Sequence, residues 1–167
     1  MSTARVSGLS DEHAAHARKQ ILKACHIMVA NKQHVHYSQE ANRWEGIHYK
    51  LSITKGEFPH HADCSSTAQW LLWDAMARPY GVRDLVSHSN WTGGYTGSQY
   101  KNGKRVVHDK NLKVGDLIFY GDQGEGVPEH VAVYVGGGKV FSHGSEGGPY
   151  ILDIDYRDDR RMARRYI

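Results

Sequence analysis

Cysteine is scarce in this sequence: Cys25 and Cys64 are the only two among 167 residues. Two cysteines cannot form the disulfide framework that holds small secreted domains together. No apolar run approaches the ~20 residues that a membrane-spanning helix needs. The opening Met-Ser-Thr-Ala-Arg is followed by a charged helical pattern and not by a hydrophobic leader. We therefore expect no signal peptide, synthesis in the cytoplasm and no insertion into a membrane.

The sequence also lacks a strong excess of charge of either sign. Its formal net charge is +3, which is too small to indicate a nucleic-acid partner, and no standard nucleic-acid-binding motif is present. The positive charge is uneven, because five arginines lie close to the C-terminus: Arg157, Arg160, Arg161, Arg164 and Arg165. Residues 158–166 read as a terminal helix, and such a cluster is usually its solvated face. The alternative is a surface that holds an anionic polymer.

The hydrophobic pattern changes its period along the chain. Residues 11–31 carry an apolar stripe at helical spacing that includes Cys25, with Ser10 as the predicted N-cap. From residue 112 the pattern predicts short strands over 114–120, 130–135, 139–143 and 150–155, joined by turns that favour antiparallel pairing. Helices followed by a meander indicate an α+β fold. Without a repeat or a low-complexity linker, we expect one domain over 1–167, with its core at about 11–166.

Cys64 lies where the second long helix should begin. The stretch Asp63-Cys64-Ser65-Ser66 precedes apolar residues at helical spacing, and Asp63 can accept hydrogen bonds from the first free N–H groups as the N-cap. The thiol would then occupy the positive end of the helix dipole, which favours the nucleophilic thiolate. The alternative is a small buried cysteine in a core helix. Cys25, in the apolar stripe, is expected to be such a core residue.

A nucleophilic thiol needs a base and a group that orients the base. His130 stands at the first position of a predicted strand, after a glycine-rich loop, and His143 lies near the end of the next strand. The two imidazoles could meet across this hairpin. The alternative is that both are ordinary strand residues in a chain with twelve histidines. The histidines of residues 32–62 lack the spacing of a structural zinc site, so no metal is expected.

These motifs, in this order, resemble the NlpC/P60 cysteine peptidases. The matching stretches are Asp63-Cys64-Ser65-Ser66 before a helix, Gly115 to Tyr120, His130 to Gly136, and a strand that carries His143. The stretch from Val140 to Glu146 is similar to peptidase domains of actinobacteriophage endolysins. The resemblance implies a papain-like α+β fold, with N-terminal helices packed on an antiparallel sheet and the catalytic cysteine opening a helix. It also implies hydrolysis of amide bonds in the peptide stems of peptidoglycan.

The resemblance assigns roles by position. It makes Cys64 the nucleophile, His130 the general base and acid, and His143 the orienting third residue. Tyr37 matches a tyrosine of the family's site, and the start of the helix, with Ser65, would supply oxyanion donors. Asp63 is primarily the helix cap, with contact to a substrate amine as an alternative.

The sequence departs from the family pattern at two positions. Ser66 stands where glycine is usual, and the turn Gly136-Gly137-Gly138 is one residue longer than expected. The longer turn makes Ser142 and Glu146 rivals of His143. Glu146 would be the stronger electrostatic partner for an imidazolium.

Two other functions remain open at this level. A non-catalytic wall-binding module would use the aromatic, glycine-rich residues 90–100 together with the basic C-terminus. A thiol acyltransferase would use the same thioester chemistry with a different acceptor. The peptidase interpretation needs no cofactor, takes peptidoglycan and not nucleic acid as partner, and expects a monomer that acts on the cell wall after release.

Overall fold

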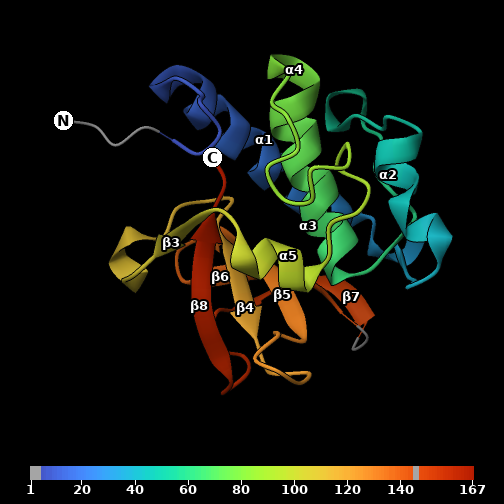
Figure 1. Cartoon of the computed structure of the whole chain (residues 1–167). Coiled ribbons are helices and arrows are strands. Elements are labelled where there is room, and N and C mark those ends of the chain that lie inside the picture. Colours follow the sequence, from blue (N-terminus) through green and yellow to red (C-terminus); the bar gives the residue numbers. More distant parts are fainter. Residues whose placement is uncertain (1–4, 145–146) are drawn as a thin grey trace.

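In the computed structural model, which describes residues 5–144 and 147–167, a layer of helices lies over a six-stranded sheet (Figure 1). The elements have the following bounds: α1 Asp11–Ala30, β1 His36–Tyr37, α2 Glu45–His48, β2 His61–Ala62, α3 Cys64–Leu72, α4 Arg78–Tyr80, α5 Thr96–Lys101, β3 Lys104–Val106, β4 Leu117–Tyr120, β5 His130–Gly136, β6 Lys139–Gly144, β7 Gly147–Asp153 and β8 Arg160–Arg165.

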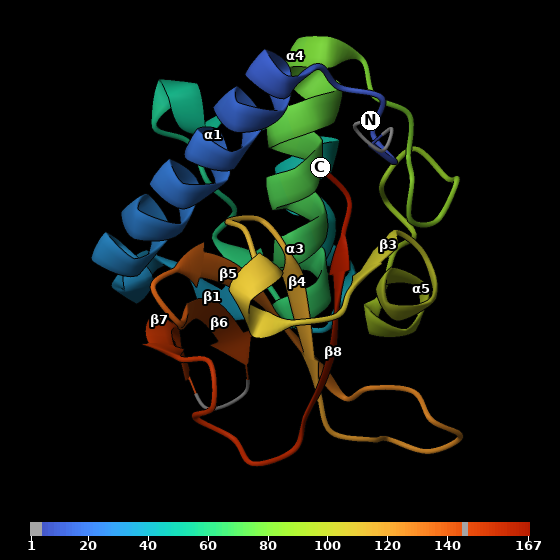
Figure 2. The same ribbon diagram turned by 90° about the vertical axis from the view of Figure 1, so that its left-hand side faces the viewer.

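Helix α1 begins where its sequence predicts. The Ser10 hydroxyl accepts a hydrogen bond from the His13 N–H at 3.1 Å and caps the helix. Its apolar stripe is buried, and Cys25 is fully buried within it, which confirms the core assignment of this cysteine. Figure 2 shows α1 starting beside α4 and running down past the α3 side of the helical layer toward β7.

The strands form one antiparallel sheet in the order β3-β8-β4-β5-β6-β7. Alternate side chains of β5 point to opposite faces. Val131 and Val133 pack against the helices in the main core, whereas Ala132 and Tyr134 belong to a smaller cluster on the other face. The predicted α+β fold, with helices on an antiparallel sheet, is thus confirmed.

The C-terminal segment differs from its prediction. Residues 160–165 form strand β8 and not a helix, because β8 fills the place between β3 and β4. Ala163 lies opposite both Val106 and Ile118, so β8 contributes an apolar side chain to the second cluster. The predicted solvated helix face is therefore wrong, and long-range strand pairing decides the structure of this segment.

Most of the C-terminal arginines are committed to contacts within the fold. Arg160 pairs with Asp109, with both nitrogen–oxygen distances at 2.8 Å, and Arg165 pairs with the buried Asp116 in the same two-pronged way. Arg164 donates to the backbone carbonyl of Tyr100 at 2.7 Å. These guanidinium groups brace β8 against its neighbours, which leaves them little freedom to bind a polymer.

Helix α3 carries the chain from the sheet to the top of the molecule (Figure 1). It continues through a wider turn at Trp73–Ala77 into α4. Gly81 then ends the run in a left-handed conformation with φ of 66°, as its position after Pro79 predicts. Among the described residues, no helix combines the length and apolar character needed to cross a membrane.

Candidate functional site

Cys64 is the first residue of α3. Asp63 caps the helix, because its Oδ1 accepts the Ser66 N–H at 2.8 Å while the Ser66 hydroxyl accepts the Asp63 N–H at 2.9 Å. This reciprocal capping box confirms the predicted helix start. It also gives Ser66, which stands where the family usually has glycine, a direct part in fixing the backbone around the thiol.

The second oxygen of the Asp63 carboxylate is also engaged. Asp63 Oδ2 lies 3.0 Å from Arg43 Nη1, and the Ser65 hydroxyl donates to Oδ1 at 3.3 Å. Asp63 is 3% exposed, so the ion pair with Arg43 balances a buried charge. The Asp63 carboxylate thus caps the helix and accepts the Ser65 hydroxyl, and both residues also line the hollow beside the thiol.

The thiol of Cys64 is half-buried and surrounded by donors. Its sulfur lies 3.9 Å from Thr96 Oγ1, and the backbones of Val131 and Ser65 hydrogen-bond to it. Burial nevertheless raises the pKa of the Cys64 thiol, because loss of water outweighs these bonds and the nearby Asp63 charge adds to the effect. A neighbouring proton acceptor would offset this effect of burial.

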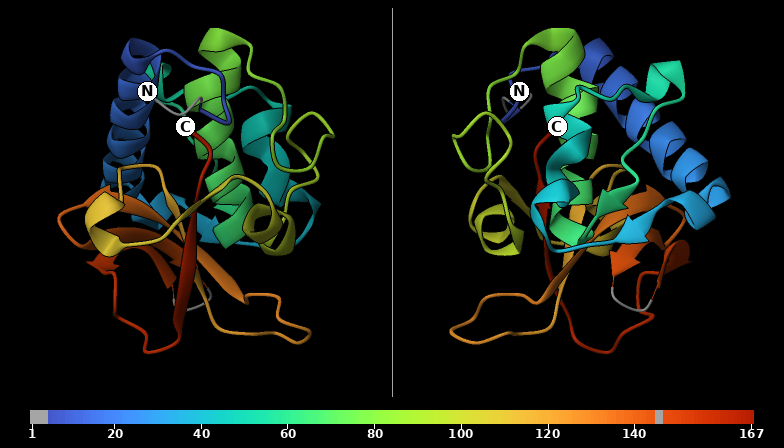
Figure 3. Two further views of the ribbon diagram at one scale, coloured as in Figure 1. Left: turned by 60° about the vertical axis from the view of Figure 1, so that its left-hand side comes forward. Right: turned by 90° about the vertical axis from the view of Figure 1, so that its right-hand side faces the viewer.

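Cys64 and His130 line the same hollow, which has a volume of about 530 Å³. Its walls come from the start of α3, the start of α5 and the start of β5, which Figure 3 shows at one end of the helical layer. Tyr37 also lines it, placed by the parallel pairing of β1 with β2 immediately before Cys64. The structure thus brings together three residues that lie far apart in the sequence.

His130 is buried at the first position of β5 and contacts Ser142. Its Nε2 lies 2.9 Å from Ser142 Oγ, and the same hydroxyl lies 3.3 Å from the Tyr156 hydroxyl. Ser142 is fully buried, so it holds the imidazole in place from the side away from solvent. Ser142, one of the two rivals that the sequence left for His143, is thus in contact with His130.

His143 lies on the other face of the sheet. Because Tyr134 pairs with Val140 and Val133 with Phe141, Ser142 shares the face of His130 and His143 faces the helices. There the Nδ1 of His143 lies 3.3 Å from Thr67 Oγ1, and its ring lies edge-on to Tyr37 at 5.9 Å. The ring-to-ring contact expected between His143 and His130 is therefore not the arrangement seen.

The physical reason is a shift of register. The pairing of β5 with β6 is irregular between Tyr134 and Gly136, at the glycine turn that the sequence shows to be long. A slip of one residue moves every following side chain to the opposite face. The geometry favours Ser142 as the third residue, while the catalytic role of His143 stays a prediction. Glu146, the other rival, lies outside the described residues.

Several residues of the hollow were not singled out by the sequence. Thr96 and Tyr95 come from the start of α5, inside a glycine-rich segment that reads equally well as a surface loop. Arg43 and Arg157 add positive charge, and Arg157 forms an ion pair with Glu129 at the rim. The sequence indicated Arg157 only as a member of the C-terminal arginine cluster. For the others the only signal was the dense mixture of aromatic, glycine and polar residues in long segments, which does not indicate individual positions.

The histidines before Cys64 pair across β1 and β2. His36 lies opposite His61, with ring centroids 5.6 Å apart, and Glu45 accepts the backbone N–H groups of His60 and His61. In the part of the chain that the structure describes, no group of three or more metal-ligating side chains is gathered. These histidines therefore belong to the short parallel pair of strands, β1 and β2, that precedes Cys64.

Residues 43–155 match the model of the NlpC/P60 family. Among curated proteins, the chain is 38% identical over 77 residues to the gamma-D-glutamyl-L-lysine dipeptidyl-peptidase of Bacillus cereus, which covers 43% of this chain and 23% of the relative. It is 28% identical over 113 residues to the bifunctional muramidase/DL-endopeptidase CwlT of Bacillus subtilis. The aligned region covers 67% of this chain and 30% of that relative. The chain thus spans less than a third of these relatives.

Solved structures show the same fold at lower identity. A hypothetical invasion protein of Mycobacterium tuberculosis matches with a TM-score of 0.59 at 20% identity, covering 95% of this chain and 66% of that one. The P60 domain of an antigen from Mycobacterium avium subspecies paratuberculosis matches with a TM-score of 0.52 at 21% identity. The match covers 90% of this chain and 97% of that domain's chain.

Proposed function

Because the chain belongs to the NlpC/P60 family, we propose that it is a cysteine peptidase of bacterial peptidoglycan, with Cys64 as nucleophile and His130 as base. The observation that supports the proposal is the hollow that both side chains line, at the start of a capped helix. A buried thiol with a raised pKa gains from a neighbouring imidazole that can take its proton. The contact of Ser142 with Nε2 orients the ring, so we assign proton transfer with the thiol to Nδ1.

The proposed reaction passes through a covalent intermediate. His130 takes the proton of the Cys64 thiol, the sulfur attacks the amide carbonyl, and the carbon–nitrogen bond breaks as His130 protonates the leaving amine. Water then attacks the thioester, with His130 taking its proton and returning it to the sulfur. Backbone N–H groups at the start of α3 stabilise the oxyanion together with Tyr37, and each donor is worth about 3 kcal/mol.

Charges around the hollow suit a substrate with both carboxylates and amines. Arg43 and Arg157 supply positive charge, and Glu129 supplies negative charge at the same opening. Peptide stems of peptidoglycan carry groups of both signs. The name of the Bacillus cereus relative supports an amide bond between D-glutamate and L-lysine as the point of cleavage, and the name of CwlT supports a bond between a D- and an L-residue. We further propose that the biological result is lysis of the wall after release from the cell, as in a phage endolysin.

One experiment tests this function. Purified peptidoglycan is digested with the wild-type protein and with Cys64→Ala, and the soluble fragments are analysed by mass spectrometry. We expect fragments with a new D-glutamate carboxyl terminus from the wild type and none from the variant. Equal release by both proteins would refute Cys64 as nucleophile. Since no step uses a metal, EDTA should leave the rate unchanged, and strong inhibition by EDTA would contradict the thiol mechanism.

A further inference from the structure

A second, strongly basic hollow lies on the sheet edge formed by β3. It consists of two adjoining depressions, about 210 and 470 Å³ in volume, that share Lys104, Lys113 and Arg165. Seven cationic side chains line the pair: Arg5, Arg18, Lys104, Arg105, Lys110, Lys113 and Arg165. No carboxylate side chain lines either one. For a chain whose net charge is only +3, this is a marked local concentration of charge.

Four of these cations differ from the arginines of β8. In the described parts of the chain, no acidic side chain forms an ion pair with Lys104, Arg105, Lys110 or Lys113. By contrast, the arginines that support the fold have partners, as Arg165 has Asp116. The positive charge available for binding is therefore on β3 and the segment after it, and not on the C-terminal arginines that the sequence indicated.

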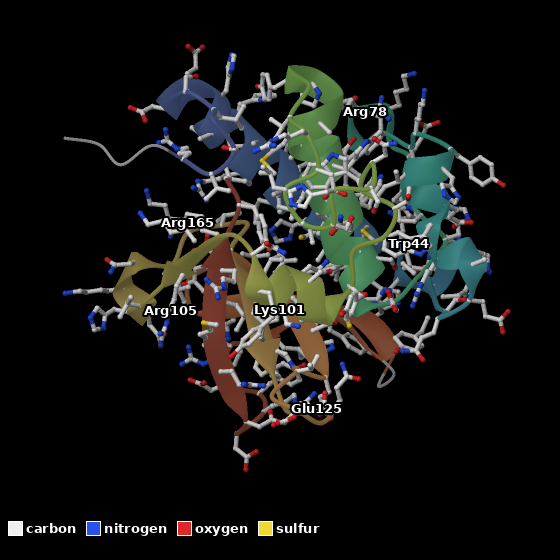
Figure 4. The ribbon with its side chains drawn as sticks, in the orientation of Figure 1. Trp44, Arg78, Lys101, Arg105, Glu125 and Arg165 are labelled. Carbon is white, nitrogen blue, oxygen red and sulfur yellow. The ribbon has the colours of Figure 1, made fainter. Side chains whose placement is uncertain are left out.

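The strand register brings the charges together at a cost. Lys104 lies directly opposite Arg165, and Arg105 lies opposite Arg164, so two like-charged pairs face each other between β3 and β8. Like charges at directly opposed positions destabilise an antiparallel pair. Because successive strand residues point to opposite faces, an anion beside Lys104 and Arg165, which line both depressions, would relieve the repulsion of that one pair. Figure 4 shows Arg105 and Arg165 on the same side of the molecule, on the part formed by β3 and β8.

The shape of the basic hollow suggests a polymer. Two depressions that share three cationic side chains have room for more than one anionic group, which matches charges that recur along a chain better than one isolated anion. No aromatic side chain lines either depression, so a stacking platform for nucleobases is not present there. Spaced cations without aromatic residues suit phosphodiester groups joined by flexible, non-aromatic units.

We propose that the β3 edge binds an anionic wall polymer of the polyphosphodiester class. The proposal rests on the proposed function, which directs the protein to the cell wall. β3 stands three strands from β5 in the sheet, or roughly 14 Å at ~4.8 Å per strand. The polymer and the peptide can therefore bind at the same time. Binding at β3 would keep the protein on the wall between cleavage events.

The test compares two triple variants of equal net charge. Lys104→Gln/Arg105→Gln/Lys113→Gln removes three cations from the β3 edge. Lys19→Gln/Lys23→Gln/Lys55→Gln removes three exposed lysines that line neither depression. Both variants have a formal net charge of zero, so any difference between them reports the position of the charges and not their sum.

The probe is poly(glycerol phosphate), titrated calorimetrically at several salt concentrations. For single-stranded polyanions, each ionic contact adds ~0.7 to the slope with which log K falls against the logarithm of the salt concentration. On that basis, loss of three contacts weakens binding roughly 50-fold at ~0.15 M salt. We expect this loss, with a reduced salt slope, in the β3 variant, and affinity close to wild type in the control. Cleavage of a soluble peptidoglycan peptide should be unchanged in both variants.

Other outcomes would overturn the proposal. Equal weakening of both variants would reduce it to an effect of net charge. Absence of binding by the wild type would mean that the lysines only protect an open sheet edge from pairing. Tighter binding of an oligonucleotide with the same number of phosphates would favour nucleic acid instead. If the wild type binds the polymer but does not cleave the soluble peptide, the proposed function fails while this inference stands.

Discussion

Replacing Ser142 by alanine should slow hydrolysis without unfolding the protein. The hydroxyl lies 2.9 Å from Nε2 of His130, and both groups are buried, so water cannot replace the lost bond. The imidazole becomes a cation when it takes the thiol proton, and a hydrogen bond to a charged group is worth about 1.5–3 kcal/mol. At 1.36 kcal/mol per decade, kcat/KM should fall roughly 10- to 150-fold.

The pH profile distinguishes this role from a structural one. Without the Ser142 hydroxyl the protonated imidazole of His130 loses an acceptor and is destabilised. Because His130 must be neutral to take the thiol proton, the acid limb of kcat/KM should move to lower pH. The matched comparison is the His143→Ala variant, because the His143 ring contacts Thr67 on the opposite face of the sheet. We expect His143→Ala to lower the melting temperature more than the rate. The reasoning is refuted if His143→Ala loses more activity than Ser142→Ala at temperatures where both are folded.

Three further predictions concern the thiol, its helix cap and one buried carboxylate. Iodoacetamide should alkylate Cys64, which lines the hollow, far faster than the fully buried Cys25, as mass mapping will show; equal rates would exclude an accessible thiol. Asp63→Ala should remove about 1–2 kcal/mol of stability with the cap, seen as a melting temperature lower by roughly 2–8 °C; an unchanged value would contradict the capping box. Asp84 accepts bonds from the Ser87 hydroxyl and from nearby backbone N–H groups, which lower its pKa although burial opposes them. A carboxylate whose pKa is lower in the folded than in the unfolded protein stabilises the fold at neutral pH, and this stabilisation is lost as the pH falls. The Asp84→Asn variant should therefore have a lower free energy of unfolding at neutral pH and a weaker dependence of that free energy on pH in acid. An acid transition identical to that of the wild type would count against this.

Local sequence rules predicted the site's scaffold well. Asp63 was expected to cap the helix that begins at Cys64, and the reciprocal bonds with Ser66 confirm it. The alternation along β5 was also expected, with its valines toward the better buried face, and they pack under the helices. These features depend on contacts within a few residues, where capping and periodicity act directly.

The neighbour of His130 could not be read from the sequence in the same way. His143 and Ser142 are adjacent, and only the register of β6 against β5 decides which of them faces His130. That register depends on an irregular turn, and a shift of one residue exchanges the two faces. The pKa of the thiol has a similar origin, because the burial that raises it depends on packing by α5 and β5, which are distant in sequence.

The sequence by itself determined the position of Cys64 at a helix start, the α+β order of elements and the motifs that indicate the family, because each depends on local periodicity or on a short run of residues. The tertiary structure decided that Ser142 contacts His130, that residues 160–165 form a strand, and that four cations without an ion pair line the hollow at β3 and the segment after it. These outcomes depend on which strands pair and in which register. Long-range packing sets both, and no short stretch of sequence encodes them.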